Sequence, residues 1–188
     1  GTMIRETAAD GAREHLITGI AGKRDFLAVH VQKAHMSSKV GIVRRALTVF
    51  EDYGVSVEHI PTGVDSFGIV VNGADVQDSI YSIVHDLQKE LKPDSINVVD
   101  RLALISVVGR NMSRRAGTSG RVFGVLGEAG INIRMITQSS QEISIILGVN
   151  NADFERAITC IYDKFVAGEM VEIPQQGEGQ PTGARRAT

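Results

Sequence analysis

Apolar and polar residues along this chain follow the same order twice. Between residues 26 and 71, and again between 102 and 147, an apolar strand pattern is followed by a polar loop with glycine, an amphipathic helix pattern, a glycine and two further strands. Such a repeat predicts two copies of one structural unit. Matching residues stand at a constant offset of 76 positions: Met36 and Met112, Ser37 and Ser113, Gly41 and Gly117, Arg45 and Arg121, Gly54 and Gly130, Ile60 and Ile136, Ile69 and Ile145.

The first copy predicts a βαββαβ unit. Apolar residues recur at helical spacing from Gly41 until Gly54, which is typical of a helix stop. Asp75 is the expected N-cap of a second helix, which Pro93 ends. The expected strands are residues 26–31, 55–60, 67–71 and 96–99.

The second copy repeats this order but lacks a convincing last strand. Residues 170–173 are a weak candidate, whereas residues 15–20 (HLITGI) form a surplus strand before the first copy. We therefore predict that this N-terminal strand completes the second unit, so that the first unit is inserted into the second. The expected elements of the second copy are strands 102–108, 131–137 and 142–149, a helix over 118–129, and a helix capped by Asp153.

The predicted fold class is α+β, with tandem ferredoxin-like βαββαβ units whose helices cover one face of an antiparallel sheet. The other face needs a cover from the second unit or from another chain. The expected organisation is a flexible lead-in (1–14), a second unit made of 15–22 plus 101–173, a first unit (23–100) and a disordered tail (174–188).

Composition narrows the class of function. The net charge is −2, and no run of Lys or Arg exceeds two residues, which argues against nucleic-acid or membrane partners. The longest apolar stretches are strand-sized, the N-terminus lacks a signal-peptide pattern, and a lone Cys160 cannot form an internal disulfide. A cytoplasmic location is therefore expected.

The sequence shows no catalytic constellation. Its five histidines lie in different predicted elements without metal-ligand spacing, so no metal site is expected. The loop over residues 109–120 is basic and rich in glycine, but it lacks the G-K-[ST] ending of a phosphate loop. No cofactor is therefore expected in this chain.

The repeat fits a small-ligand site built from backbone groups better than it fits a catalytic, metal or phosphate site. Gly41 and Gly117 each precede a helix, where free N–H groups attract an anion such as an α-carboxylate. Glycine also lets a ligand approach the backbone closely. We expect the first residues of the following strand to face the same pocket: Ser56, Val57 and Glu58 in the first copy, and Asn132, Ile133 and Arg134 in the second.

Residues 104–149 resemble the second ACT domain of aspartate kinases. The shared features are a V-V-G-x-x-M loop, a helix and the run G-I-N-I-x-M-I-x-Q-x-S. ITGIAGKRDF and SVEHIPTGVDS are similar to the first ACT region of that family. The resemblance implies the inserted-unit arrangement and feedback sensing of lysine, threonine or both at ACT contacts between chains of a homodimer.

The catalytic kinase domain of that family, with its Lys-Phe-Gly-Gly motif, has no counterpart in this sequence. The resemblance therefore implies a regulatory portion or subunit that does not phosphorylate aspartate by itself and that partners a kinase domain, to which ATP and magnesium would belong. The alternatives are an amino-acid-sensing ACT protein with a different output, such as transcriptional control, and a small ferredoxin-like enzyme.

The resemblance also implies which residues bind the effector. Met36 and Ile42 could instead be plain core, and Glu58 a solvated strand carboxylate. Because Glu58 attracts an ammonium and Arg134 repels one, the first copy is expected to hold lysine, whereas Asn132 and Gln138 suit threonine. The implied effector residues are Met36, Ser38, Lys39, Gly41, Ile42, Val43, Ser56, Val57 and Glu58 in the first copy, and Gly117, Thr118, Asn132, Ile133 and Gln138 in the second.

Overall fold

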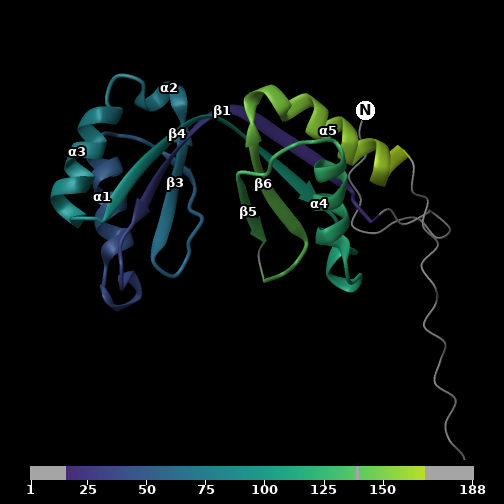
Figure 1. Cartoon of the computed structure of the whole chain (residues 1–188), viewed down its shortest axis with the longest axis horizontal. Helices are drawn as coiled ribbons and strands as arrows, with labels where there is room; N and C mark the ends of the chain where they lie inside the picture. The colour runs from purple at the N-terminus through teal and green to yellow at the C-terminus, as the bar shows by residue number, and fades with distance from the viewer. Residues whose placement is uncertain (1–15, 139, 168–188) are drawn as a thin grey trace, which may run out of the picture.

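A computed structural model describes residues 16–138 and 140–167, which form one six-stranded antiparallel sheet with helices on its outer face (Figure 1). The strand order is β2-β3-β1-β4-β6-β5. The strands are β1 (Gly19–Gln32), β2 (Val57–His59), β3 (Ser66–Asn72), β4 (Ser95–Val108), β5 (Met135–Gln138) and β6 (Ser144–Asn150). The helices are α1 (Ile42–Asp52), α2 (Gly73–Val76), α3 (Ile80–Leu91), α4 (Thr118–Glu128) and α5 (Phe154–Tyr162), with single turns η1 (Met36–Ser38), η2 (Met112–Arg114) and η3 (Asn151–Asp153) and the π-helical turn η4 (Asp163–Ala167).

The two long strands β1 and β4 run through both units. The first part of β1, from Gly19 to Lys23, pairs with Val108 to Leu104 of β4 in the second unit. The second part of β1 pairs with β3 and with the start of β4 in the first unit. The predicted topology is therefore confirmed: the N-terminal strand completes the second unit, and the first unit is inserted into it.

Each of these long strands was expected as two separate strands, and that expectation is wrong. Of the predicted strands 15–20 and 26–31, residues 19–20 and 26–31 belong to the single strand β1, and residues 96–99 and 102–108 belong to β4. The polar residues that suggest breaks form irregular positions inside the strands. Asp25 and Arg101 adopt positive φ angles of 66° and 51°. Asn151 holds the irregular segment of β1, because its side chain accepts from the Asp25 N–H at 3.2 Å and donates to the Asp25 carboxylate at 2.7 Å.

Each unit has its own apolar core between the sheet and its helices. Phe50 and Leu87 are fully buried in the first unit, and Leu126 and Ile161 in the second. The buried residues Leu16 and Ile17, which precede β1, also belong to the core of the second unit. Full burial of one such side chain stabilises the fold by about 1.5–3 kcal/mol.

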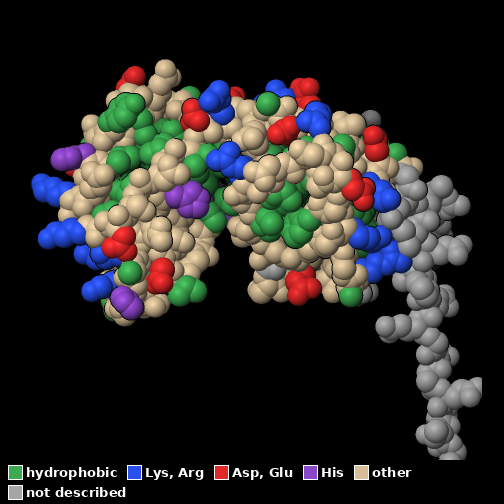
Figure 2. Space-filling model, viewed as in Figure 1, with side chains coloured by type: hydrophobic (Ala, Val, Ile, Leu, Met, Phe, Trp, Pro, Cys, Tyr) green, Lys and Arg blue, Asp and Glu red, His purple; other side chains and the backbone are tan. Residues whose placement is uncertain are grey.

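The sheet bends where β1 and β4 pass from one unit to the other. The helices of the two units therefore lie on opposite outer sides, and the helix-free faces turn toward each other (Figure 1). A third apolar cluster fills the apex of the bend; its buried members are Phe26, Ala28, Val70 and Leu102. Beyond the apex the lobes separate and leave a hollow (Figure 2). The second unit thus covers part of the helix-free face of the first.

Two smaller expectations need correction. The second strand of each unit is shorter than predicted, because residues 55–56 and 131–134 lie outside β2 and β5. Asp75 is not an N-cap: it lies within α2, whose cap Asn72 accepts from the Ala74 N–H at 3.3 Å, and α3 begins later at Ile80. The predicted lead-in (1–14), weak strand (170–173) and tail (174–188) lie outside the described residues.

Deletion of residues 1–22 tests the inserted-unit topology. The deletion removes Leu16 and Ile17 from the second core, at a cost of about 3–6 kcal/mol, which is comparable with the whole stability of a typical domain. It also exposes the backbone of β4 as an open edge. We expect an aggregating protein without a cooperative thermal transition by circular dichroism. Deletion of residues 1–14 is the control. A soluble 1–22 deletion variant that melts as the control does would contradict the topology.

Candidate functional site

The two helix starts that the repeat predicts have the same geometry. Gly41 and Gly117 are the N-caps of α1 and α4, with φ angles of +74° and +81°, which a residue with a side chain rarely adopts. Neither helix has a side-chain cap hydrogen bond. The Ile42 N–H at the start of α1 donates to the Lys39 carbonyl at 3.4 Å. Since the other first-turn N–H groups of a helix have no partner within the helix, both starts can accept an anion.

The loop before α1 is held from two sides. The Met36 N–H donates to the Asp65 carboxylate at 3.3 Å, and the Ser38 hydroxyl donates to the His35 carbonyl at 2.8 Å. Met36 and Ile42 are buried in the first core, which agrees with the alternative interpretation of both as core residues. Lys39 is exposed. Val43 is half-buried on α1. The loop thus offers backbone and one exposed cation to a ligand.

The second unit uses its polar side chains internally. Thr118 is 4% exposed, and its hydroxyl donates to the Arg115 carbonyl at 2.7 Å. The Ser119 hydroxyl donates to the Gln138 side-chain oxygen at 3.1 Å, which joins the start of α4 to the end of β5. Gln138, one of the implied effector residues, therefore lies beside the helix start.

In each unit, the first residues of the second strand lie at the opposite end from the helix start. Val57 pairs with Val71, which pairs with Leu27 near the bend, whereas the loop containing Met36 follows the far end of β1. Helix α1 has 11 residues, so about 16 Å separates its two ends at 1.5 Å per residue. Within one chain, the structure does not bring Ser56, Val57 and Glu58 to Gly41, nor Asn132 and Ile133 to Gly117.

Glu58 and Arg134 have partners of their own. The Glu58 carboxylate lies 3.5 Å from the Lys23 ammonium, and both side chains are about half exposed. Arg134 donates to the Asn150 side-chain oxygen at 2.9 Å. Ser56 and Asn132 are exposed, while Val57 and Ile133 pack against the cores of their units.

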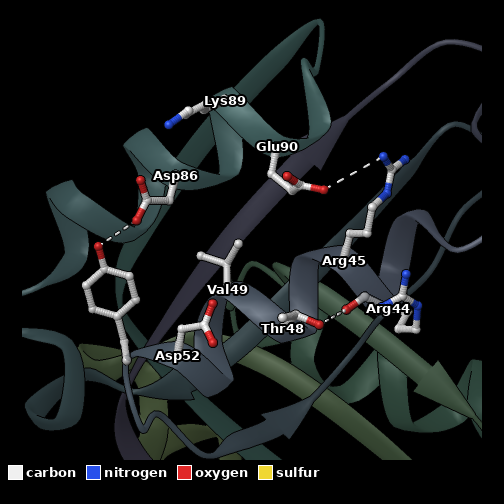
Figure 3. Close-up of a pocket in the computed structure, with 9 residues that line it drawn as sticks. Arg44, Arg45, Thr48, Val49, Asp52, Asp86, Lys89 and Glu90 are labelled. Atoms are coloured by element: carbon white, nitrogen blue, oxygen red, sulfur yellow. Dashed lines mark hydrogen bonds and ion pairs between the residues drawn. The ribbon is translucent and has the colours of Figure 1, made fainter.

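A groove of about 420 Å³ lies between α1 and α3 on the outer face of the first unit (Figure 3). Arg45 lies 3.8 Å from Glu90, and the Tyr53 hydroxyl donates to the Asp86 carboxylate at 2.7 Å. The hydrogen bond to this carboxylate raises the pKa of Tyr53. Arg45, Glu90 and Asp86 therefore already have partners within the groove, and none of the predicted effector residues lines it.

Three further cavities are lined in part by β4, and no sequence pattern predicted them. All three share Asn97; His30 lines two of them, and Arg134, just before β5, also lines two. His30 pairs directly with Asn97 across β1 and β4. Two polar residues in otherwise apolar strands were the available signal, but only the pairing register shows that they meet.

Neither a metal-binding group nor a membrane-spanning helix is seen in the described part of the chain. No group of three or more His, Cys, Asp or Glu side chains there could hold a metal ion. None of the helices described is both long and apolar enough to cross a membrane.

Known proteins resemble this chain in sequence and in structure. A family model for the ACT domain matches residues 105–165. Aspartokinase 3 of Bacillus subtilis is 34% identical over 156 residues, which cover 82% of this chain and 34% of that protein. The Clostridium acetobutylicum aspartate kinase structure has a TM-score of 0.77 and 40% identity over 81% of this chain and 35% of that one. The regulatory subunit of aspartate kinase from Thermus thermophilus shares the fold (TM-score 0.66, 20% identity, 80% of this chain and 98% of that one).

The fold, the two helix starts and the family match define a tandem ACT regulatory module. The chain belongs to the aspartate kinase family and corresponds to its regulatory ACT portion, which confirms the resemblance seen in the sequence motifs. It spans about a third of the length of the curated relatives that it matches.

The contact between the edge strands β2 and β5 predicts that the free energy of unfolding depends on pH. His59 Nε2 of β2 lies 3.0 Å from the Thr137 hydroxyl of β5, and burial lowers the pKa of His59 below its usual 6.5. Because the unfolded chain then binds a proton more readily, this residue's contribution to stability is complete above pH 6.5 and is lost as the pH falls through the lowered pKa.

We expect His59→Gln to flatten the fall in the free energy of unfolding between pH 7.5 and pH 5.5, as measured by urea denaturation. His85→Gln, at an exposed position of α3, is the control. An unchanged pH dependence in the His59 variant would count against the burial of this imidazole.

Proposed function

We propose that this chain senses an amino acid, either lysine or threonine or both, and thereby controls an aspartate kinase catalytic domain that is fused to it or forms a separate subunit. The observation that supports this proposal most is the pair of helix starts with glycine N-caps and no side-chain cap hydrogen bond, one in each ACT unit. In this proposal aspartate phosphorylation, with its ATP and magnesium, belongs to the kinase domain, and feedback control of the synthesis of aspartate-derived amino acids belongs to this chain.

The helix starts suit the group that all amino acids share. An α-carboxylate at the N-terminus of a helix accepts from free N–H groups and interacts with the positive end of the helix dipole, which contributes about 0.3–2 kcal/mol. Gly41 and Gly117 leave room for this approach. Selectivity among amino acids then has to come from side chains near the helix start.

A second copy of the chain can supply those side chains. β2 is an edge strand of the sheet, and closed dimers with two-fold symmetry are the commonest homo-oligomers. If two β2 strands pair antiparallel about such an axis, the start of one strand lies beside the end of the other. The partner's residues 56–58 then approach the loop over residues 36–43. Within one chain these two segments lie at opposite ends of α1, which is about 16 Å long.

Lysine suits the first unit in this arrangement. The ion pair between Glu58 and Lys23 is exposed, and such a pair is worth about 0–1 kcal/mol, so the carboxylate can exchange Lys23 for the ammonium of a ligand at little cost. Aspartokinase III of E. coli, which shares the fold (TM-score 0.66, 21% identity), has been crystallised in complex with lysine and aspartate. Asn132 and Gln138 in the second unit carry the neutral hydrogen-bonding groups that a threonine hydroxyl requires.

The first prediction from this proposal concerns recognition of the lysine side chain. Because Glu58→Gln removes the charge that faces the ammonium, it should weaken lysine binding about tenfold or more, equivalent to about 1.4 kcal/mol, and leave threonine binding nearly unchanged. Lys23→Gln is the matched substitution: it frees the same carboxylate and should strengthen lysine binding. Calorimetric titration of each variant with both amino acids measures these effects. Lysine binding of wild-type strength in Glu58→Gln would refute the recognition by Glu58.

The second prediction concerns assembly. A ligand bound across an interface stabilises the dimer, because binding and association are linked. Sedimentation velocity should show a dimer at micromolar concentration whose dissociation constant falls when lysine or threonine is added. Glycine, which carries the shared α-carboxylate and ammonium without a side chain, is the control. A monomer under all of these conditions would rule out an effector site between copies.

A further inference from the structure

We propose that the bend between the two ACT units contains a second ligand site, which binds a small carboxylate with a short, branched apolar tail. The site is a cavity of about 220 Å³ on the helix-free face of the sheet. It is separate from the helix starts at Gly41 and Gly117, and it does not depend on the proposed effector function.

Both units build this cavity. β1 and β4 contribute His30 and Asn97 from their first-unit halves, and Arg134 comes from the segment that leads into β5. The rest of the wall is apolar and continuous with the cluster at the apex of the bend; it consists of Ala28, Val99, Leu102 and Met135. The cavity therefore combines three polar groups with an apolar wall, as small-molecule sites usually do.

Arg134 determines the charge of the ligand. Its guanidinium donates to the neutral Asn150 side chain at 2.9 Å, and among the described residues it has no carboxylate within ion-pair distance. A planar guanidinium binds a carboxylate through two parallel hydrogen bonds. His30 and Asn97 lie on the same cavity wall and can hydrogen-bond the remaining polar atoms of the ligand.

The size and the wall determine the rest of the ligand. Sites for drug-sized ligands span about 300–1,000 Å³, so a cavity of about 220 Å³ fits a smaller molecule. The apolar wall suits a short branched hydrocarbon group, whose burial contributes about 0.8 kcal/mol per CH₂. The shared chemistry is thus a carboxylate on a branched C4 or C5 skeleton, which free short-chain acids, their 2-oxo derivatives and apolar amino acids all provide.

The five methionines of the chain provide a test that separates this site from the helix starts. Met135 lines the cavity, whereas Met36 and Met112 lie in the turns that precede α1 and α4. Protein labelled with ¹³C at the methionine methyl groups is titrated with 3-methylbutanoate, 4-methyl-2-oxopentanoate and L-leucine in separate arms, with acetate as the control anion. Met135→Leu assigns the Met135 signal.

We expect a saturable shift of the Met135 signal, with Met36 and Met112 unmoved, at up to about 10 mM ligand, which saturates a site with a Kd of 1 mM. Whichever arm produces the shift identifies the source of the carboxylate. Arg134→Gln should abolish the shift, and Asn97→Ala should weaken it at least threefold. Arg45→Gln, on the outer helical face, should leave the shift intact.

Three results would overturn the proposal: no shift of Met135 in any arm, an equal shift with acetate, or an unchanged shift in both Arg134→Gln and Asn97→Ala. A shift confined to Met36 or Met112 would also overturn it, because the ligand would then occupy a helix start. Failure of this site leaves lysine and threonine binding at the helix starts untouched, so the two proposals can be told apart in one sample.

Discussion

The antiparallel pairing of β1 with β4 is the interaction on which the rest of the structure depends. Each strand is 14 residues long and serves both units in turn, so neither unit has a complete sheet without the other. The first unit lies between the two strands in the sequence, whereas the second unit is assembled from both sides of it. Since a lone strand edge is prone to aggregation, this shared pairing joins the folding of the two units.

The same pairing determines where ligands can bind. The bend of β1 and β4 turns the helix-free faces toward each other and creates a cavity to which both units contribute. The helix starts lie at the far ends of the units, away from the bend. Edge strands β2 and β5 touch through His59 and Thr137, which joins the two units at a second place besides the bend.

Much of this fold could be predicted from the sequence because the repeat carries it. The constant offset aligns Gly41 with Gly117, and the surplus strand pattern at the N-terminus compensates for the last strand that the pattern of the second copy lacks. The continuity of the long strands could not be predicted, since Asp25 is of a type that often marks turns and Asp100 and Arg101 interrupt the apolar pattern. Only the tertiary contact of Asn151 with Asp25 shows that the chain continues as a strand there.

The candidate site was predictable only in part, for a related reason. A local pattern predicts that a helix start with glycine binds an anion, and the structure has both helix starts. A local pattern does not show which end of the next strand lies beside the helix start, and Glu58 was therefore expected at the wrong end of its own unit. His30 and Asn97 were missed because each is a single polar residue in an apolar strand, and only the pairing register brings them together.

The central claim is that a second copy of the chain completes the amino-acid site. Hydrogen exchange followed by mass spectrometry, with and without lysine, tests it most directly. Pairing of β2 with a second β2 protects its backbone N–H groups, so we expect lysine to slow exchange in residues 56–63 and in residues 36–43 together, at the same ligand concentration. Slower exchange in residues 36–43 alone would contradict the claim, because lysine would then bind within one chain.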